Sequence, residues 1–207
     1  MNSLALYDRV CIGASRTTTS LYSTSFSLGV RSLHARFREP IHAIYGFVRF
    51  ADEIVDTFHG HDKASLLQRF KEDTERAIAE RISLNPILHS YQRTVHQFGI
   101  GPELYRTFLR SMEMDLSELE HDDRSYKEYI LGSAEVVGLM CLRVFCEGDD
   151  ALYERLKPAA MRLGSAFQKV NFLRDLKDDH LNLGRTYFPD VDVKRMSAKE
   201  KEGIEAD

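Results

Sequence analysis

The sequence lacks the features that would place the chain across a membrane, in a secretory pathway or on a nucleic acid. No window approaches the roughly 20 uninterrupted apolar residues that a membrane-spanning helix needs. The first ten residues, MNSLALYDRV, show no basic stretch followed by an apolar run, which a signal peptide requires. The net charge of −4 offers no broad basic surface to a nucleic-acid backbone. We therefore expect a cytoplasmic protein without a nucleic-acid partner, which could still take lipid substrates as a peripheral protein at the inner face of the membrane.

Cysteine is also scarce. The three cysteines, Cys11, Cys141 and Cys146, are an odd number and have no metal-ligand spacing. We interpret them as small hydrophobic residues buried in a protein of a reducing compartment.

The composition is that of an ordinary globular protein. The chain has 207 residues, of which 43% are hydrophobic and 29% charged, and a domain of this size buries about 70% of its unfolded surface. No internal repeat or linker divides it, and no segment alternates apolar and polar residues for long enough to predict a strand. Helical periodicity and capping signals predict helices over residues 39–58, 63–82, 85–99, 101–120, 125–145 and 150–183. We predict an all-α fold, a single-domain helical bundle over residues 1–207.

The end of the chain carries a further signal. Residues 197–200 (SAKE) read as a capping box, the start of a helix. The chain ends at Asp207, before such a helix could bury a face. We expect a bundle truncated at its C-terminus, with helices of the intact fold missing.

A stripe of polar residues runs along the helix predicted over residues 39–58. At about 100° per residue, a sector about 60° wide contains Tyr45, Arg49, Asp52 and Asp56. The stripe borders apolar residues that must pack into the core, instead of lying on the opposite, solvent-facing side. Asp52 and Asp56 are like charges at i,i+4, which destabilises an isolated helix by roughly a few tenths of a kcal/mol. We therefore expect a positive group between them.

The last predicted helix repeats this arrangement. A sector about 80° wide contains Gln168, Asn171, Asp175 and Asp179. The apolar neighbours are Phe167, Val170 and Phe172. One pair of aspartates four residues apart is usually a solvated acidic face, but two pairs, each extended by polar residues, favour a shared cavity lined by carboxylate and amide oxygens.

Such a set of oxygen ligands suits a hard cation. Magnesium is held by one or two carboxylates together with water and substrate phosphate oxygens. Zinc, copper or haem would need histidine or cysteine, and the two stripes contain neither. The spacing thus indicates magnesium and a phosphate-bearing ligand.

These residues resemble the signatures of the squalene and phytoene synthase family, the head-to-head prenyl transferases. The family's two aspartate-rich motifs correspond to residues 45–56 (YGFVRFADEIVD) and 171–179 (NFLRDLKDD). Further matching segments follow in the right order: STSF at 23–26, MEMDL at 112–116, AEVVG at 134–138, LGSAFQ at 163–168 and RTYFP at 185–189. The second motif and the segment before it look most like those of bacterial phytoene synthases.

The resemblance implies an isoprenoid synthase type of bundle around a central cavity, and a role for each motif residue. The implied magnesium ligands, with manganese as a substitute metal, are Asp52, Asp56, Asn171, Asp175 and Asp179. The implied catalytic residues are Asp52, Asp56, Asp175, Asp179, Tyr45 and Tyr129, and the implied substrate-binding residues are Arg49, Arg174, Ser25, Phe26, Gln168, Asn171, Val137 and Gly138. Arg174 must reach back round the helix towards Asp175, and Val137 and Gly138 could equally serve plain helix packing. Asp115 could be a site residue or form a surface salt bridge.

The implied reaction joins two geranylgeranyl diphosphates head to head through a cyclopropyl diphosphate intermediate. It yields phytoene, as in carotenoid biosynthesis, and releases diphosphate. Farnesyl diphosphate would instead give squalene or dehydrosqualene, and NADPH would be needed only for squalene. Pocket depth separates these substrates, and the sequence does not show it.

Other classes of protein fit the stripes less well. A terpene cyclase or head-to-tail prenyl transferase typically carries DDxxD, and a di-iron bundle needs inward-facing Glu-x-x-His pairs. Neither stripe has such a pattern. A family member that acts only as an assembly or interaction module would be expected to have lost the carboxylates, and it stays an alternative.

Overall fold

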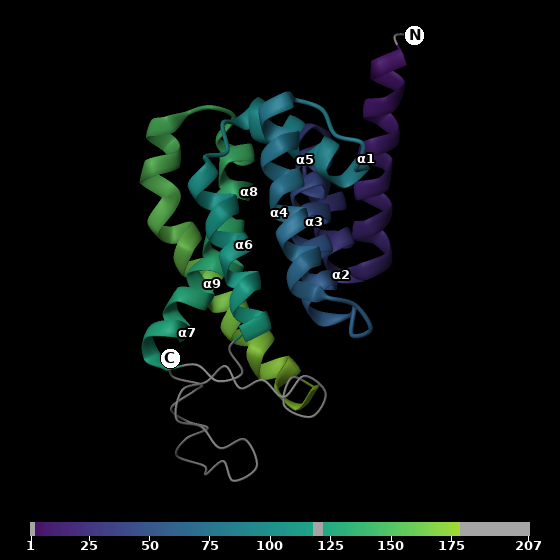
Figure 1. The fold of residues 1–207 in the computed structure, drawn as a ribbon. Helices are drawn as coiled ribbons and strands as arrows, with labels where there is room; N and C mark the ends of the chain where they lie inside the picture. The colour runs from purple at the N-terminus through teal and green to yellow at the C-terminus, as the bar shows by residue number, and fades with distance from the viewer. Residues whose placement is uncertain (1–2, 118–121, 179–207) are drawn as a thin grey trace.

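The computed structural model describes residues 3–117 and 122–178, and these residues form helices joined by short connections (Figure 1). The elements are α1 (Ser3–Tyr22), α2 (Thr24–Ser32), α3 (Ala35–Asp56), α4 (Lys63–Glu80), α5 (Pro86–Phe98), α6 (Pro102–Ser117), α7 (Asp123–Ile130), the π-helical segment η1 (Leu131–Glu135), α8 (Val136–Cys146) and α9 (Asp150–Asp178). No strand occurs in the described ranges, which confirms the predicted all-α bundle.

The capping residues of α4 and α5 define the ends of these helices. The Asp62 carboxylate accepts from the Ser65 N–H at 3.0 Å, and Asn85 caps the first turn of α5, where Pro86 stands. Gly99, at φ 62°, ends α5 in the left-handed conformation that glycine adopts at little cost. These ends lie where the sequence predicted them, whereas α4 stops two residues early because Arg81 turns left-handed at φ 58°.

The start of α3 differs from the prediction. Helix α3 begins at Ala35 with His34 as its N-cap, so Pro40 lies inside the helix and not in its first turn. The first turn closes instead through a hydrogen bond of 3.0 Å from the Phe37 N–H to the His34 carbonyl. Proline has no N–H, so Pro40 removes only the hydrogen bond to the Arg36 carbonyl, near the N-terminal end of α3. Burial of the residues that follow maintains the helix.

The helix predicted over residues 125–145 is continuous, but it is not one regular α-helix. A capping box between Asp122 and Ser125 starts α7, and the wider turn η1 separates α7 from α8. An ideal Cβ at Gly132 would lie 2.6 Å from the Ser111 Cβ, and one at Gly164 would lie 3.0 Å from the Ala134 carbonyl oxygen. The π-turn is therefore held closely between α6 and α9, and such turns occur often at functional sites.

The main core forms where α3, α4, α5 and α6 meet. The rings of Phe47 and Tyr91 are stacked with centroids 3.9 Å apart, and Phe70 and Phe108 pack on Phe47 from two other helices. A smaller cluster contains Met114, Tyr126, Tyr129, Ile130 and Phe172. Because α3 is anchored by buried aromatic rings, its polar stripe is held in a fixed orientation beside the core.

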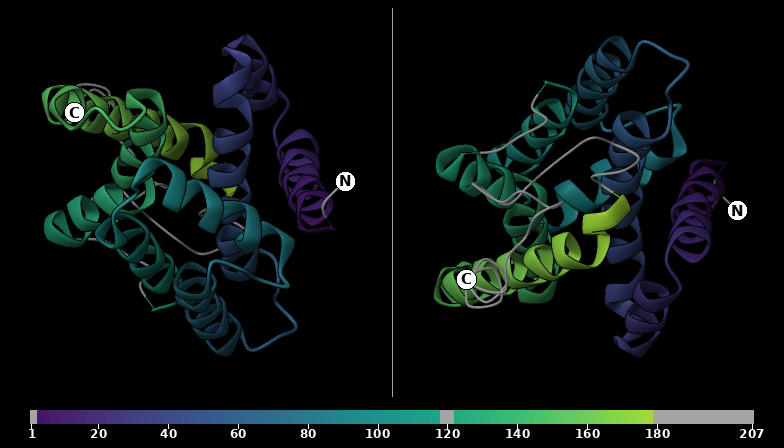
Figure 2. Two further views of the ribbon diagram at one scale, coloured as in Figure 1. Left: turned by 90° about the horizontal axis from the view of Figure 1, so that it is seen from above. Right: turned by 90° about the horizontal axis from the view of Figure 1, so that it is seen from below.

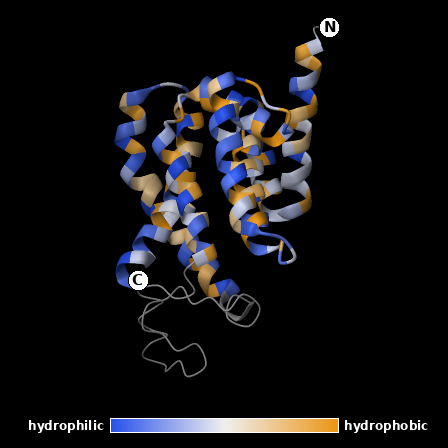
Figure 3. Ribbon diagram, viewed as in Figure 1, coloured by the Kyte–Doolittle hydropathy of each residue, from blue (hydrophilic) through white to orange (hydrophobic). Residues whose placement is uncertain are grey.

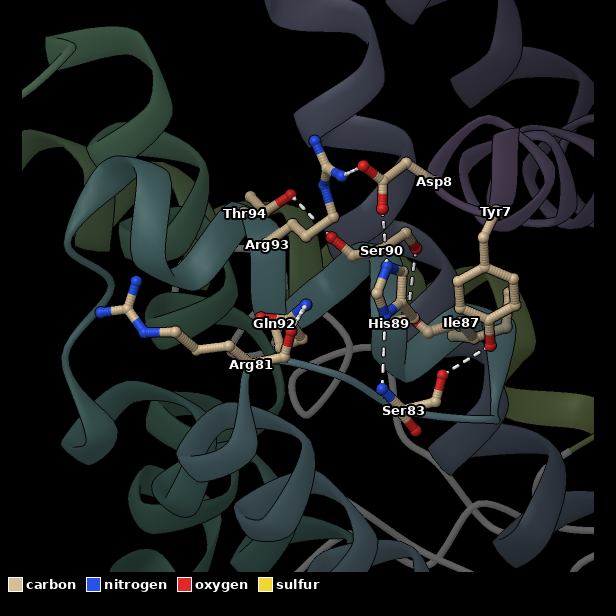
Figure 4. A network of polar contacts seen from close by, with 10 residues as sticks. All are labelled: Tyr7, Asp8, Arg81, Ser83, Ile87, His89, Ser90, Gln92, Arg93 and Thr94. Atoms are coloured by element: carbon tan, nitrogen blue, oxygen red, sulfur yellow. Dashed lines mark hydrogen bonds and ion pairs between the residues drawn. The ribbon is translucent and has the colours of Figure 1, made fainter. Parts of the chain in front are cut away.

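A polar network attaches α1 to α5 (Figure 4). His89 is 2% exposed, and its Nδ1 accepts from the Ser83 N–H at 3.3 Å. The Nε2 atom therefore carries the proton and donates to Asp8 Oδ1 at 2.8 Å. Asp8 also pairs with Arg93, and the Tyr7 hydroxyl donates to the Ser83 carbonyl at 2.6 Å. Burial lowers the pKa of His89, which keeps the ring neutral.

One apolar stretch extends from α7 to α8. By length and composition alone, Asp123–Cys146, which contains an 18-residue window with a mean hydropathy of 1.6, could cross a membrane. Half of that window is buried inside the bundle, and core helices of soluble proteins pass the same test. Figure 3 shows hydrophilic and hydrophobic residues interspersed along the helices. The stretch is thus weak evidence for membrane insertion.

The three cysteines are free. Cys11 and Cys146 are buried, as expected for small hydrophobic residues, whereas Cys141 is only partly buried.

Candidate active site

A cavity of about 310 Å³ brings the two aspartate stripes together. Its walls consist of Val48, Asp52 and Asp56 from α3, Met112 from α6, Tyr129 and Ser133 from α7 and η1, and Gln168, Asn171, Phe172, Arg174 and Asp175 from α9. In both views of Figure 2, α3 lies between α1 and the C-terminal part of α9. A groove of about 400 Å³ between α1, α3 and α5 is larger, but it contains neither stripe. Chemistry, and not size, identifies the candidate site.

The carboxylate of Asp52 lies in an electrostatically unfavourable position. Burial, and then repulsion from Asp56, raise the pKa of Asp52 from 3.8 to about 8, while Arg49 opposes the shift. The side chain is still partly exposed, as expected for a carboxylate in a cavity wall that solvent can reach. Added positive charge beside Asp52 would therefore be favourable, and this is where the sequence predicted that a cation binds.

The first half of the α3 stripe lies outside the walls of this cavity. Tyr45 stacks on Phe26 of α2, with ring centroids 4.8 Å apart, and burial raises the pKa of the Tyr45 hydroxyl. Phe26 is 38% exposed, and Ser25 is exposed beside Ser23, with 3.5 Å between the hydroxyl oxygens. Helix α2 thus covers Tyr45, and a contact of these residues with substrate stays a prediction.

Arg49 has a partner that the sequence reasoning missed. Its guanidinium pairs with the buried carboxylate of Glu53 and lies over the ring of Tyr22, 4.4 Å from the centroid. The Nε atom of Arg49 is buried and has no hydrogen-bond partner among residues 3–117 and 122–178. The spacing of Arg49 and Glu53 at i,i+4 could have revealed this pair.

On α9, Arg174 reaches back to Asp175, and its role towards a diphosphate stays a prediction. Its Nε and a terminal nitrogen donate to the two carboxylate oxygens at 2.8 and 2.6 Å. Gln168 and Asn171 line the cavity in the same stripe. Asp179, the remaining predicted ligand of this helix, lies outside the described residues, so its role stays a prediction.

The apolar flank of α9 differs from the expectation. Phe172 is buried in the smaller cluster, but Phe167 and Val170 are 64% and 59% exposed. The prediction that all three pack beside the stripe was wrong for two of them. Helical period alone does not show which of two neighbouring faces a bundle covers.

The structure places the predicted tail-binding residues elsewhere. Val137 packs against the main core, and an ideal Cβ at Gly138 would lie 3.5 Å from the Ala160 carbonyl oxygen of α9. Neither residue lines the described cavity. The contacts are those of plain helix packing, and a contact with a prenyl tail stays a prediction.

Four residues of the cavity wall were not predicted as site residues: Val48, Met112, Ser133 and Phe172. Met112 lies in the matching segment MEMDL, and Phe172 was expected only as an apolar neighbour of the α9 stripe. Val48 stands one turn before Asp52 on the same face, so the helical period could have indicated it. Ser133 belongs to the π-turn η1, and its hydroxyl donates to the Tyr129 carbonyl at 2.8 Å. A π-turn has no simple sequence signal, so Ser133 could not have been predicted.

The donor atoms on the walls fit magnesium. Within residues 3–117 and 122–178, no group of three or more histidine, cysteine or acidic side chains could hold a metal ion by itself. The oxygen donors on the walls are the carboxylates of Asp52, Asp56 and Asp175 and the amides of Gln168 and Asn171. Magnesium takes few protein ligands and completes its shell with water and phosphate oxygens. The raised pKa of Asp52 also marks a place where positive charge would be favourable.

Comparison with known proteins identifies the family. The sequence model of squalene/phytoene synthase matches residues 19–206. The chain belongs to the squalene/phytoene synthase family.

Several relatives in this family are similar over most of the chain. The chain is 33% identical over 183 residues to a presqualene diphosphate synthase of Sinorhizobium fredii, covering 85% of the chain and 61% of that protein. It is 30% identical over 169 residues to a presqualene diphosphate synthase of Rhodopseudomonas palustris, covering 80% and 58%. A chloroplastic phytoene synthase of an Oncidium hybrid cultivar is 31% identical over 186 residues, with 87% and 44% covered. The chain thus spans about three fifths of the length of the two presqualene diphosphate synthases.

Solved structures of squalene/phytoene synthases show the same fold. A squalene synthase, HpnC, from Alicyclobacillus acidocaldarius superposes with a TM-score of 0.78 at 24% identity, covering 89% of this chain and 68% of that one. A dehydrosqualene synthase in complex with ligand gives 0.76 at 21% identity, covering 88% and 62%. The isoprenoid synthase type of bundle is confirmed.

Proposed function

We propose that this chain binds two prenyl diphosphates through magnesium and joins them head to head, forming a cyclopropyl diphosphate and releasing diphosphate. One observation carries the proposal: the aspartates of α3 and α9 line one cavity together with the amides of Gln168 and Asn171. The family membership supports the same class of reaction.

The polar residues of the cavity bind and orient the diphosphates. Asp52, Asp56 and Asp175 would hold the metal ions from two sides of the cavity, and the Asn171 amide oxygen adds a neutral ligand. Magnesium, when bound, would neutralise diphosphate charge and act as a Lewis acid on the leaving group. Arg174, which donates two hydrogen bonds to the Asp175 carboxylate, would add the positive charge of its guanidinium to that of magnesium at the same wall.

The remaining wall excludes water from the reacting carbons. Val48, Met112 and Phe172 supply apolar surface, and the ring of Tyr129 lies beside that of Phe172, with centroids 6.0 Å apart. An ionised allylic carbon would be quenched by water, so a dry wall protects it. The electron-rich face of an aromatic ring also tolerates a passing cation.

Two products are candidates. Joining of two geranylgeranyl diphosphates to phytoene is the prediction from the sequence motifs. Relatives named presqualene diphosphate synthase, at 33% and 30% identity, favour a second candidate that stops at the cyclopropyl diphosphate. A 4,4'-diapophytoene synthase of Staphylococcus haemolyticus at 27% and a 15-cis-phytoene synthase of Pantoea ananas at 27% belong to the same range of similarity.

Product analysis tests the proposal. The full chain is incubated with magnesium and either farnesyl or geranylgeranyl diphosphate, with and without NADPH, and the products are identified by mass spectrometry. We expect a cyclopropyl diphosphate or a head-to-head hydrocarbon, and loss of product in Asp56→Asn but not in Asp73→Asn, an exposed aspartate of α4. Absence of product from both substrates, combined with no magnesium-dependent binding of a non-hydrolysable prenyl diphosphate, would favour the assembly-module alternative.

The cellular location is proposed from the sequence alone. We propose a cytoplasmic protein that can contact the membrane peripherally when it releases an apolar product. Fractionation of cells that express the chain would test this, and recovery only after detergent extraction would contradict it.

A further inference from the structure

A buried carboxylate lies directly behind the tyrosine of the cavity. Asp115, near the end of α6, is 6% exposed, and Tyr129, near the end of α7, is 5% exposed. The Tyr129 hydroxyl donates to Asp115 Oδ2 at 3.0 Å. Tyr129 lines the cavity, whereas Asp115 is not among the residues of its wall.

The direction of this hydrogen bond determines what Tyr129 offers to the cavity. A tyrosine hydroxyl has one proton and two lone pairs, and an ionised carboxylate can only accept. Once the proton is directed to Asp115, the phenol oxygen can present only lone pairs to the cavity. Such an oxygen accepts hydrogen bonds and stabilises nearby positive charge, but it cannot donate.

The ring of Tyr129 is held independently of this bond. It packs beside Phe172 in the smaller cluster, and the Ser133 hydroxyl donates to the Tyr129 backbone carbonyl at 2.8 Å. Packing and the π-turn η1 thus fix where the ring lies, and Asp115 is left to fix the direction of the hydroxyl proton.

We propose that Asp115 is a positioning residue, which holds the Tyr129 hydroxyl proton away from the cavity so that the phenol oxygen faces the reacting carbons with its lone pairs. The inference rests on the proposed function, since it assigns the oxygen a role towards a carbon that becomes positive during head-to-head joining. Asp115 would act through Tyr129, without touching the substrate.

Replacing Asp115 with asparagine removes the charge of the carboxylate and keeps the shape of the side chain. Asp115→Asn keeps the volume of the side chain, but its amide can donate to the phenol oxygen and occupy a lone pair. We expect kcat to fall about tenfold or more, with KM and the magnesium requirement unchanged. Tyr129→Phe should lose a similar factor, and the double variant should be no slower than Tyr129→Phe alone.

The kinetic outcomes that overturn the proposal are distinct. If the double variant loses kcat by the product of the two single-variant factors, Asp115 acts independently of Tyr129. A higher magnesium requirement in Asp115→Asn would make Asp115 a metal ligand instead. Equal kcat in Asp115→Asn and wild type would remove any role in the reaction.

A spectroscopic readout keeps the test independent of activity. In protein labelled with 3-fluorotyrosine, the ¹⁹F resonance that is missing from Tyr129→Phe belongs to Tyr129. We expect Asp115→Asn to shift this resonance, and Asp73→Asn to leave it unchanged. An unshifted resonance would contradict the hydrogen bond itself. A shifted resonance in a protein that forms no product from either diphosphate would instead refute the proposed function and leave the pairing of the two residues intact.

Discussion

Replacing Asp52 with asparagine should stabilise the metal-free protein. The pKa of Asp52 rises from 3.8 to about 8 because the carboxylate is buried and faces Asp56. An acid whose pKa is higher in the folded than in the unfolded chain binds more protons when folded, so the free energy of unfolding falls as the pH rises between these two values. At 1.36 kcal/mol per pKa unit, the full shift corresponds to about 6 kcal/mol, of which about 4 kcal/mol is reached at pH 7.

The measured gain should be smaller than this limit. Solvent reaches the cavity wall and lowers the cost of the buried charge. We therefore expect Asp52→Asn to raise the free energy of unfolding by on the order of 2 kcal/mol at pH 8. The gain should shrink as the pH is lowered to 5, because the pH then approaches 3.8, the pKa of this carboxyl in the unfolded chain, and the unfolded chain loses its advantage in releasing the proton. Magnesium should reverse the ranking, because the wild-type protein binds the ion more tightly and is stabilised by mass action.

Urea unfolding at several pH values, followed by circular dichroism, measures this difference. Asp73→Asn is the matched control, since this exposed aspartate lies in the middle of α4 and, in the part of the chain that the structure describes, pairs only with Arg76 at 3.6 Å. Its free energy of unfolding should change by about 0.5 kcal/mol or less at every pH. A gain for Asp52→Asn that is absent, or that is the same at pH 5 and pH 8, would refute the electrostatic reasoning.

Two further predictions concern stability. Gly132→Ala should destabilise the fold by about 1–3 kcal/mol, because the new Cβ would lie 2.6 Å from the Ser111 Cβ. A Cβ at Gly13 in α1 meets nothing within 4 Å, so Gly13→Ala should raise the free energy of unfolding by about 0.5–1 kcal/mol. Urea unfolding measures both variants. Equal effects of the two substitutions would contradict the close approach at η1. Because burial lowers the pKa of His89 below 6.5, the unfolded chain binds more protons, and stability should fall as the pH drops through that value. His89→Gln should flatten this part of the pH profile of the melting temperature, and an unchanged slope would contradict the neutral pairing with Asp8.

The helices could be predicted largely from the sequence because their signals are local. Asp62, Asn85 and Gly99 act on backbone groups within a few residues, so the start of α4 and both ends of α5 follow from short segments. The two aspartate stripes are local in the same way, since the period of one helix sets them. Pro40 is the exception: its place in α3 depends on burial of the residues that follow it.

Only the tertiary structure decided how the stripes combine. That Asp52 and Asp175 share a cavity depends on how α3 and α9 pack, and the burial of Asp115 behind Tyr129 depends on α6 and α7. The exposed Phe167 shows the same limit, since the period that placed Asp175 could not tell which neighbouring face is covered. The sequence by itself thus determined the helices and the carboxylate and amide groups on their polar faces, on which the proposed magnesium site rests. The cavity, and the groups that orient its residues, required contacts between distant segments, which no local periodicity encodes.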